Sequence, residues 1–141
     1  MLYNKKYMRK DPLKIQSHVL LGFLIVQYIL GITINLFVQF PDTKSETVLW
    51  EFAKSQTAVM LHIILGGLLL IGACVFMVRA ARSKNKQWII SASVGLFAIL
   101  VAVITGAKFV PTQEDMFSFI MALAFIVALI AYSWGIYKAK G

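Results

Sequence analysis

Residues 58–78 read AVMLHIILGGLLLIGACVFMV, a run of 21 residues without a formal charge. A helix of this length spans the hydrocarbon core of a bilayer, which is about 30 Å thick. The run contains one imidazole, His62, and the glycines Gly66 and Gly67 follow it. Ionisable side chains are rare in membrane segments and usually mark functional sites. The stretch therefore predicts a transmembrane helix and makes His62 the first candidate for a functional residue.

The composition extends this prediction to the whole chain. Hydrophobic residues make up 60% of the 141 residues and charged residues only 14%, whereas soluble domains are about one-quarter charged. Three further apolar runs bring the predicted spans to four, at about 15–38, 58–78, 88–107 and 116–137. We expect an all-α four-helix transmembrane bundle, up-down-up-down, forming a single membrane domain over residues 1–141. The first apolar run is too long for the core of a cleavable signal peptide.

The basic residues lie on alternate sides of the predicted spans. One side carries eleven basic residues and one acid, Asp11; the other carries three basic residues and five acids. The positive-inside rule accounts for this asymmetry and predicts that both termini are cytoplasmic, in a cell-membrane protein with several spans. The formal net charge of +8 therefore reflects topology, and we expect contact with the lipid bilayer and no nucleic-acid partner.

Several local patterns refine the expected boundaries. Asp11-Pro12 is typical of a helix start, and Gln27 lies near the membrane midplane, where it should have a partner. In the outer loop 39–57, the apolar residues of segment 48–53 have helical spacing. They predict either a short interfacial helix or an extension of the second span. A second outer loop, 109–115, contains Pro111, and its two acids should begin the last helix.

The two histidines cannot hold one metal ion between them. His18 is near the inner end of the first span and His62 near the outer end of the second, so they are separated by about 20 Å in depth. A haem at His62 would need other groups at its own depth. The candidates are two axial methionines, Met116 and Met121, three glycines that would admit a flat ring, Gly31, Gly66 and Gly106, and two lysines for propionates, Lys54 and Lys108. Each also has a simpler explanation, since glycine and methionine serve helix packing and a histidine can hydrogen-bond a neighbouring helix.

Other chemistries lack the residues that they need. No Asp or Glu lies inside a predicted span, which argues against a proton-coupled exporter. Cys74 is the only cysteine, so an intramolecular disulfide or a relay between two cysteines is excluded. The sequence contains neither an HExxH motif nor a glycine-rich phosphate loop. No complete catalytic constellation is visible, and the sequence does not predict an enzyme.

Short motifs in all four spans resemble one four-helix half of the haem A synthase family. They are His18-x-x-x-Gly22 with Gly31, His62 at the start of the second span, Thr105-Gly106 at the end of the third, and Phe117-Ser118-Phe119-Ile120 at the start of the fourth. The resemblance implies a single-repeat module, similar to a b-type cytochrome, with His62 as a haem ligand. The family's second ligand falls at Phe117, which cannot bind iron, so Met116 or Met121 would replace it. The family's outer-loop cysteine pair and the acid before the second-span histidine are missing.

We therefore expect a small membrane protein that holds haem b near its outer face, with His62 on the iron, for electron transfer, haem handling or sensing. The alternative is a cofactor-free accessory subunit whose polar residues Gln27, Asn35 and His62 bind other helices of a larger membrane complex. A homodimer of two such modules is a further interpretation. A small-molecule transporter comes third, because no charged residue in the bundle would couple transport.

Overall fold

The computed structural model describes residues 11–139, and this part of the chain is helical, without a strand. The helices are α1 (Pro12–Phe37), α2 (Glu46–Ser55), α3 (Thr57–Ser83), α4 (Lys86–Thr112) and α5 (Asp115–Lys138). Four of them, α1, α3, α4 and α5, are long and apolar enough to cross a membrane. The four predicted spans are thus present as helices. The basic leader before Asp11 and Lys140 lie outside the described residues.

Side chains at the helix ends explain several of these boundaries. The Asp11 carboxylate accepts a hydrogen bond from the backbone N–H of Leu13 at 3.0 Å, with Pro12 in the first turn of α1. The Asn85 side chain accepts from the backbone of Gln87 in the same way and begins α4. Such caps satisfy backbone donors that have no partner inside the helix. The helix start predicted at Asp11-Pro12 is confirmed.

Helices α3, α4 and α5 extend beyond both ends of the predicted spans, and the extension at the end of α4 changes the predicted loop. The sequence predicted a loop over 109–115, but α4 continues through Pro111 to Thr112 and ends at Gln113, which has a left-handed φ of 55°. Pro111 lies in the last turn of the helix, where the loss of its N–H disrupts a single backbone hydrogen bond. The loop between α4 and α5 is therefore shorter than predicted, and Asp115 is the first residue of α5.

The outer loop contains a separate helix. Helix α2 ends at Ser55, and Gln56 has an extended backbone conformation that breaks the chain before α3. This supports the short-helix interpretation over an extension of the second span. Of the four apolar residues with helical spacing, Val48, Leu49, Phe52 and Ala53, the structure buries Leu49 and Ala53, leaves Phe52 half-buried and exposes Val48. Helix α2 packs against α3 and α4.

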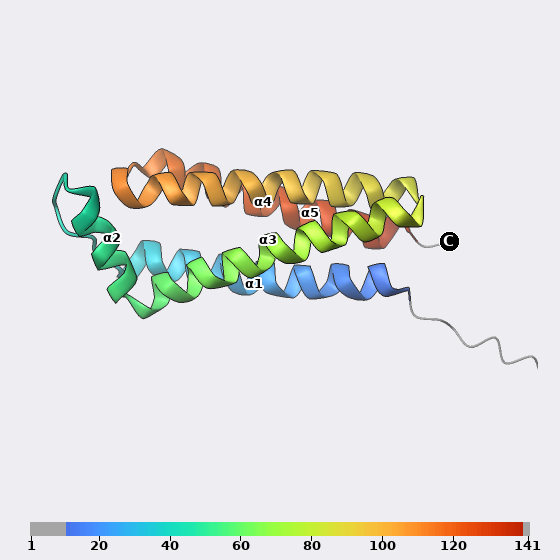
Figure 1. Ribbon diagram of the computed structural model, residues 1–141, viewed down its shortest axis with the longest axis horizontal. Coiled ribbons are helices and arrows are strands. Elements are labelled where there is room, and N and C mark those ends of the chain that lie inside the picture. Colours follow the sequence, from blue (N-terminus) through green and yellow to red (C-terminus); the bar gives the residue numbers. More distant parts are fainter. Residues whose placement is uncertain (1–10, 140–141) are drawn as a thin grey trace, which may run out of the picture.

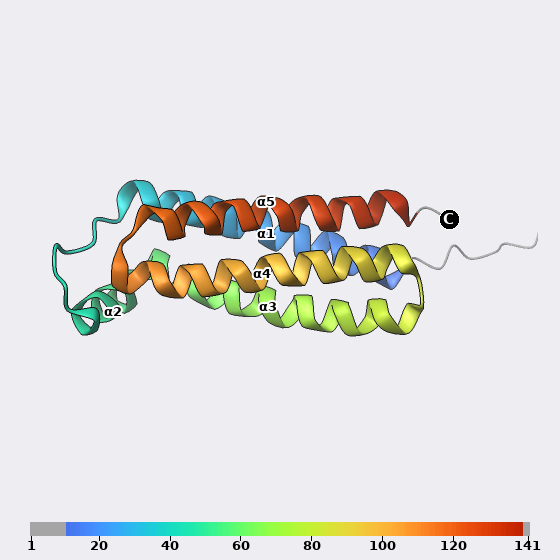
Figure 2. The ribbon, with the colours of Figure 1, turned by 90° about the horizontal axis from the view of Figure 1, so that it is seen from above.

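The four long helices form a ring in which each contacts two others, in the order α1, α3, α4, α5. The closest packing is between α4 and α5. Figures 1 and 2 show the long helices side by side, with α2 at one end of the bundle. The beginning of α1 and the end of α5 lie at the opposite end. We call these two ends the α2 end and the terminal end.

A cluster of buried aromatic side chains lies toward the terminal end. The Phe76 ring makes edge-to-face contacts with Trp88 and Tyr132, at centroid distances of 5.7 and 5.5 Å, and all three side chains are buried. Large apolar side chains cover the outside of all four long helices, among them Ile29, Leu36, Ile71, Phe97 and Ile130. An apolar exterior on every long helix is the surface expected of a chain surrounded by lipid.

Candidate functional site

A cavity of about 860 Å³ lies between the four long helices at the α2 end. Its walls are mostly apolar and come from every helix and from the loop after α1. They include Ile34, Val38, Phe40, Val59, Leu69, Ile99, Ala102, Phe109, Val110 and Phe125. Small-molecule and cofactor sites typically have volumes of about 300–1,000 Å³, apolar walls and a few polar groups. The cavity has the size and lining of such a site.

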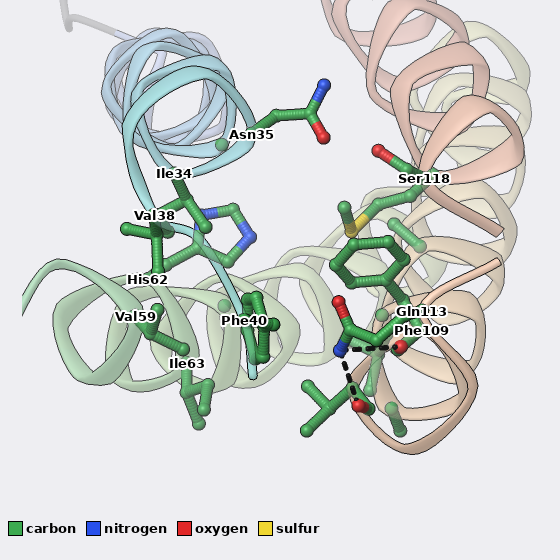
Figure 3. A pocket seen from close by; sticks show the side chains of 18 of the residues that line it. Ile34, Asn35, Val38, Phe40, Val59, His62, Ile63, Phe109, Gln113 and Ser118 are labelled. Carbon is green, nitrogen blue, oxygen red and sulfur yellow. Dashed lines mark hydrogen bonds between the residues drawn. The ribbon is translucent and has the colours of Figure 1, made fainter. Parts of the chain in front are cut away.

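His62 contributes an imidazole to the cavity wall. Figure 3 shows its ring next to α1, with one ring nitrogen toward α1 and the other toward the open space. The nitrogen on the α1 side is Nδ1, which is buried near Gly31 and the backbone of Gln27 without a hydrogen bond of standard geometry. The nearest aromatic neighbour of the ring is Phe125 on α5, edge-to-face at 6.4 Å between centroids. The other nitrogen, Nε2, makes no hydrogen bond with residues 11–139, so it is the atom available to bind a ligand.

Gln27 lies beside His62 and is 2% exposed. Its Nε2 donates a hydrogen bond to the backbone carbonyl oxygen of His62 at 2.7 Å, which supplies the partner that the sequence led us to expect. The bond joins α1 to α3 at the level of His62. The Oε1 of the same amide is buried without a partner. The cavity wall thus contains a second unsatisfied polar atom, one that accepts hydrogen bonds.

Five of the seven predicted site residues line this cavity: His62, Gly66, Gly31, Gly106 and Met121. The other two do not. Met116 is 62% exposed on the outside of α5, and Lys108 is exposed with its Nζ 5.8 Å from the centre of the Phe117 ring. The structure therefore distinguishes the two methionines.

The three glycines make room for polar or sulfur-containing side chains of neighbouring helices. A Cβ on Gly31 would lie 3.2 Å from Cε1 of His62. One on Gly66 would lie 3.2 Å from Nε2 of Gln27, and one on Gly106 would lie 3.2 Å from Sδ of Met121. The glycines thus allow His62, Gln27 and Met121 to approach the facing backbone. Their role in the structure is close packing around the cavity, beside the predicted role of admitting a ring.

Polar groups gather where the loop between α1 and α2 covers the cavity. Asp42, Thr43, Lys44, Asp115 and Ser118 all line it there, and Gln113 caps the end of α4 by donating to the carbonyl oxygen of Val110 at 2.6 Å (Figure 3). Of the three basic residues predicted at this end, only Lys44 reaches the cavity; Lys54 and Lys108 are exposed outside its lining.

Sequence reasoning missed Gln27 and Asn35 as cavity residues, although a signal was present. Gln27, Gly31 and Asn35 are spaced four residues apart and so lie on one face of α1; all three line the cavity. On α5, Ser118, Met121 and Phe125 follow the same helical spacing and also line it. When polar and small residues repeat along one face of a membrane helix, that face is expected to point into the bundle.

The residues present fit a haem in three respects. The volume and apolar walls suit a macrocycle, Nε2 of His62 faces the open space without a hydrogen bond among the described residues, and Met121 is one helical turn from Phe125, the residue that faces this ring. Lys44 is the cation available to a propionate group. Among residues 11–139 no group of three or more His, Cys, Asp or Glu could hold a metal ion. No family model, curated protein or solved structure matches the chain.

Proposed function

We propose that this multi-pass membrane protein binds b-type haem in the cavity at the α2 end, with His62 as an axial ligand. The observation that carries the proposal is the imidazole of His62, whose Nε2 faces a largely apolar cavity of about 860 Å³ and makes no hydrogen bond with the described residues. A bound haem would supply one-electron chemistry for electron transfer, haem handling or sensing. The resemblance to one half of haem A synthase agrees with a histidine at this position.

Met121 is the proposed second ligand. Histidine and methionine are a known axial pair for haem, and this pair raises the reduction potential. Met121 lines the cavity on α5, the helix that faces the His62 ring through Phe125. Met116, five residues earlier, faces outward. The apolar wall of the cavity excludes water from the haem site. Gln27 positions His62 through its hydrogen bond to the His62 carbonyl oxygen.

The proposed topology places both termini in the cytoplasm, with the four long helices crossing in alternating directions and the cavity near the outer face. It rests on the charge asymmetry: at the terminal end the described residues include six basic side chains, Lys14, Arg79, Arg82, Lys84, Lys86 and Lys138, against Asp11. Cysteine labelling from each side of intact cells tests it. Outward labelling at Lys138→Cys together with inward labelling at Lys44→Cys would contradict it.

An absorption spectrum of the detergent-purified protein, oxidised and then reduced with dithionite, tests the haem proposal. Cells should be supplied with ample haem during expression. We expect a Soret band and sharp reduced α and β bands, lost in His62→Ala. Met121→Ala should shift the reduced spectrum and lower the potential, while the matched control Met116→Ala should leave both unchanged.

Two results would contradict the haem proposal: a flat spectrum of the folded protein, or full haem content in a folded His62→Ala variant. A flat spectrum would favour the alternative function, a cofactor-free accessory subunit that packs against other membrane subunits or a second copy. In that case His62→Phe should leave folding nearly unchanged, and the variant should be tested for loss of a co-purifying partner.

A further inference from the structure

A second hollow lies on the outside of the bundle, between α1 and α3. It is an apolar groove of about 360 Å³ lined by Val19, Gly22, Phe23, Val26 and Leu65. On α1 these residues repeat at intervals of three and four, so they form one continuous face. The side chains of Val19, Phe23 and Val26 are exposed. The groove lies within the membrane-spanning length of both helices, where its occupant must be apolar.

Gly22 creates the depth of the groove. A Cβ built on Gly22 meets no atom within 4 Å, so this glycine does not serve close packing inside the protein. This differs from Gly31, Gly66 and Gly106, each of which faces a neighbouring side chain. The space beside Gly22 is open to whatever surrounds the bundle, which in a membrane is a lipid chain.

A basic residue, Arg79, lies toward the terminal end of the contact between α1 and α3, which we call the α1–α3 seam. Leu65, Gly72 and Arg79 follow one another at intervals of seven residues and so share the face of α3 next to α1. The Arg79 Nη1 donates to Oε1 of Gln16 at 3.1 Å, and the Nε2 of Gln16 donates to the carbonyl oxygen of Gly72 at 3.3 Å. These bonds fix the guanidinium at the α1–α3 seam, about one helical turn from the end of the groove at Val19.

The charge at this position is not neutralised by the protein. Arg79 is exposed and forms no ion pair among the described residues, and Asp11, the single described acid at the terminal end, caps α1. Arg82 follows one turn later on α3. The guanidinium retains free N–H groups that match the geometry of a phosphate. From Leu65 to Arg79 the distance along α3 is about 21 Å, comparable to the depth of one leaflet with its headgroups.

We infer that the α1–α3 seam is a binding site for an anionic phospholipid of the leaflet at the terminal end. One acyl chain lies in the groove beside Gly22, and the headgroup phosphate is bound by Arg79, with Arg82 nearby. The charge complementarity of the seam selects an anionic lipid over a zwitterionic one, as basic pockets between transmembrane helices do. This site is separate from the cavity at His62 and does not depend on haem.

Native mass spectrometry of the full chain, titrated with phosphatidylglycerol or with phosphatidylcholine, tests this inference. We expect one retained phosphatidylglycerol, with retention of phosphatidylcholine weaker by about fivefold or more. Gly22→Leu should fill the groove without a clash and reduce retention of phosphatidylglycerol by about fivefold or more, and Arg79→Gln should reduce it by a similar factor.

Two matched controls keep the test specific. Ser133→Leu adds a leucine at another exposed position, on α5, away from both the groove and the cavity. Lys86→Gln removes one charge from the same end of the bundle. Both should retain phosphatidylglycerol like the unchanged chain.

Equal retention of the two lipids, or equal losses in all four variants, would overturn the inference. So would a Gly22→Leu variant that changes the oligomeric state while retaining phosphatidylglycerol, because the groove would then be an interface between copies of the chain.

Discussion

The terminal end and the α2 end of the bundle both have glycines that face side chains of a neighbouring helix, but the distances differ. At the terminal end, Gly95 and Gly135 face Tyr132 and Ser91 so closely that an added Cβ would lie 2.4 Å from a side-chain atom. At the α2 end, the corresponding distances at Gly31, Gly66 and Gly106 are 3.2 Å. Glycine permits close packing at both ends, and the packing is tighter at the terminal end than around the cavity.

The polar atoms differ between the two ends in what surrounds them. At the terminal end, two hydroxyl groups bond backbone carbonyls of the facing helix: Ser17 Oγ donates to Tyr132 O at 3.2 Å and Ser91 Oγ to Ala131 O at 2.8 Å. Buried atoms without partners occur at both ends, Gln87 Oε1 and Tyr132 Oη at the terminal end and Gln27 Oε1 and His62 Nδ1 at the α2 end. Only those at the α2 end belong to residues that line the large cavity, where a ligand could supply hydrogen bonds that lipid chains do not.

The largest expected effect is that of Gly95→Ala. The added Cβ would lie 2.4 Å from Cζ of Tyr132, whose ring is fully buried and cannot move away. We expect a loss of about 2–3 kcal/mol in the free energy of unfolding, measured by SDS denaturation in mixed micelles. Gly22→Ala is the control and should have little effect, since its Cβ meets no atom within 4 Å. Equal losses in the two variants would show that the terminal end is not the closely packed one.

Tyr132→Phe should raise the free energy of unfolding, whereas Gly95→Ala lowers it. The Tyr132 hydroxyl is buried without a hydrogen-bond partner, and its removal leaves the ring contact with Phe76 in place. We expect a gain of about 1 kcal/mol in the same denaturation measurement, because an unsatisfied buried group no longer has to be desolvated. A loss of stability would contradict this prediction, because it would mean that the hydroxyl has a partner, such as a buried water; it would also sharpen the contrast between the two ends.

Ser91→Ala should lower the free energy of unfolding by less than Gly95→Ala does. It removes the hydrogen bond from α4 to the carbonyl oxygen of Ala131 on α5, and such bonds between membrane helices are worth about 0.6 kcal/mol on average. Ser93→Ala is the matched control on the same helix: Ser93 is exposed and its hydroxyl contacts only the sulfur of Met77 at 3.6 Å. A loss at Ser93 as large as that at Ser91 would contradict the assignment of Ser91 to the packed core.

The smallest effect is expected for Gly106→Ala, at the cavity. The added Cβ would lie 3.2 Å from Sδ of Met121, the end of a flexible side chain that borders open space and can move. The change in unfolding free energy should stay below about 0.5 kcal/mol. A loss as large as that of Gly95→Ala would show that the walls of the cavity are as rigid as the terminal end.

The sequence by itself predicted the four long helices, because uncharged runs of membrane-spanning length leave an α-helix as the simplest way to satisfy the backbone. It predicted the start of α1 from Asp11-Pro12 and, from helical spacing, a helix at α2 with Leu49 and Ala53 on its apolar side. It also identified His62 and Gln27 as residues that need partners, since a polar group in an apolar segment is noticeable without any structure.

Tertiary structure decided which residues meet. Sequence reasoning ranked Met116 with Met121 and Lys108 with the site, because depth along a helix can be counted in residues whereas the direction of a side chain depends on how the neighbouring helix is rotated. The packing of α5 against α4 turns Met121 inward and Met116 outward. The same rotations bring Gln27 to the His62 carbonyl and leave Gly22 on the outside. Spacing fixes the faces of each helix, and only the contacts between helices decide which face is interior.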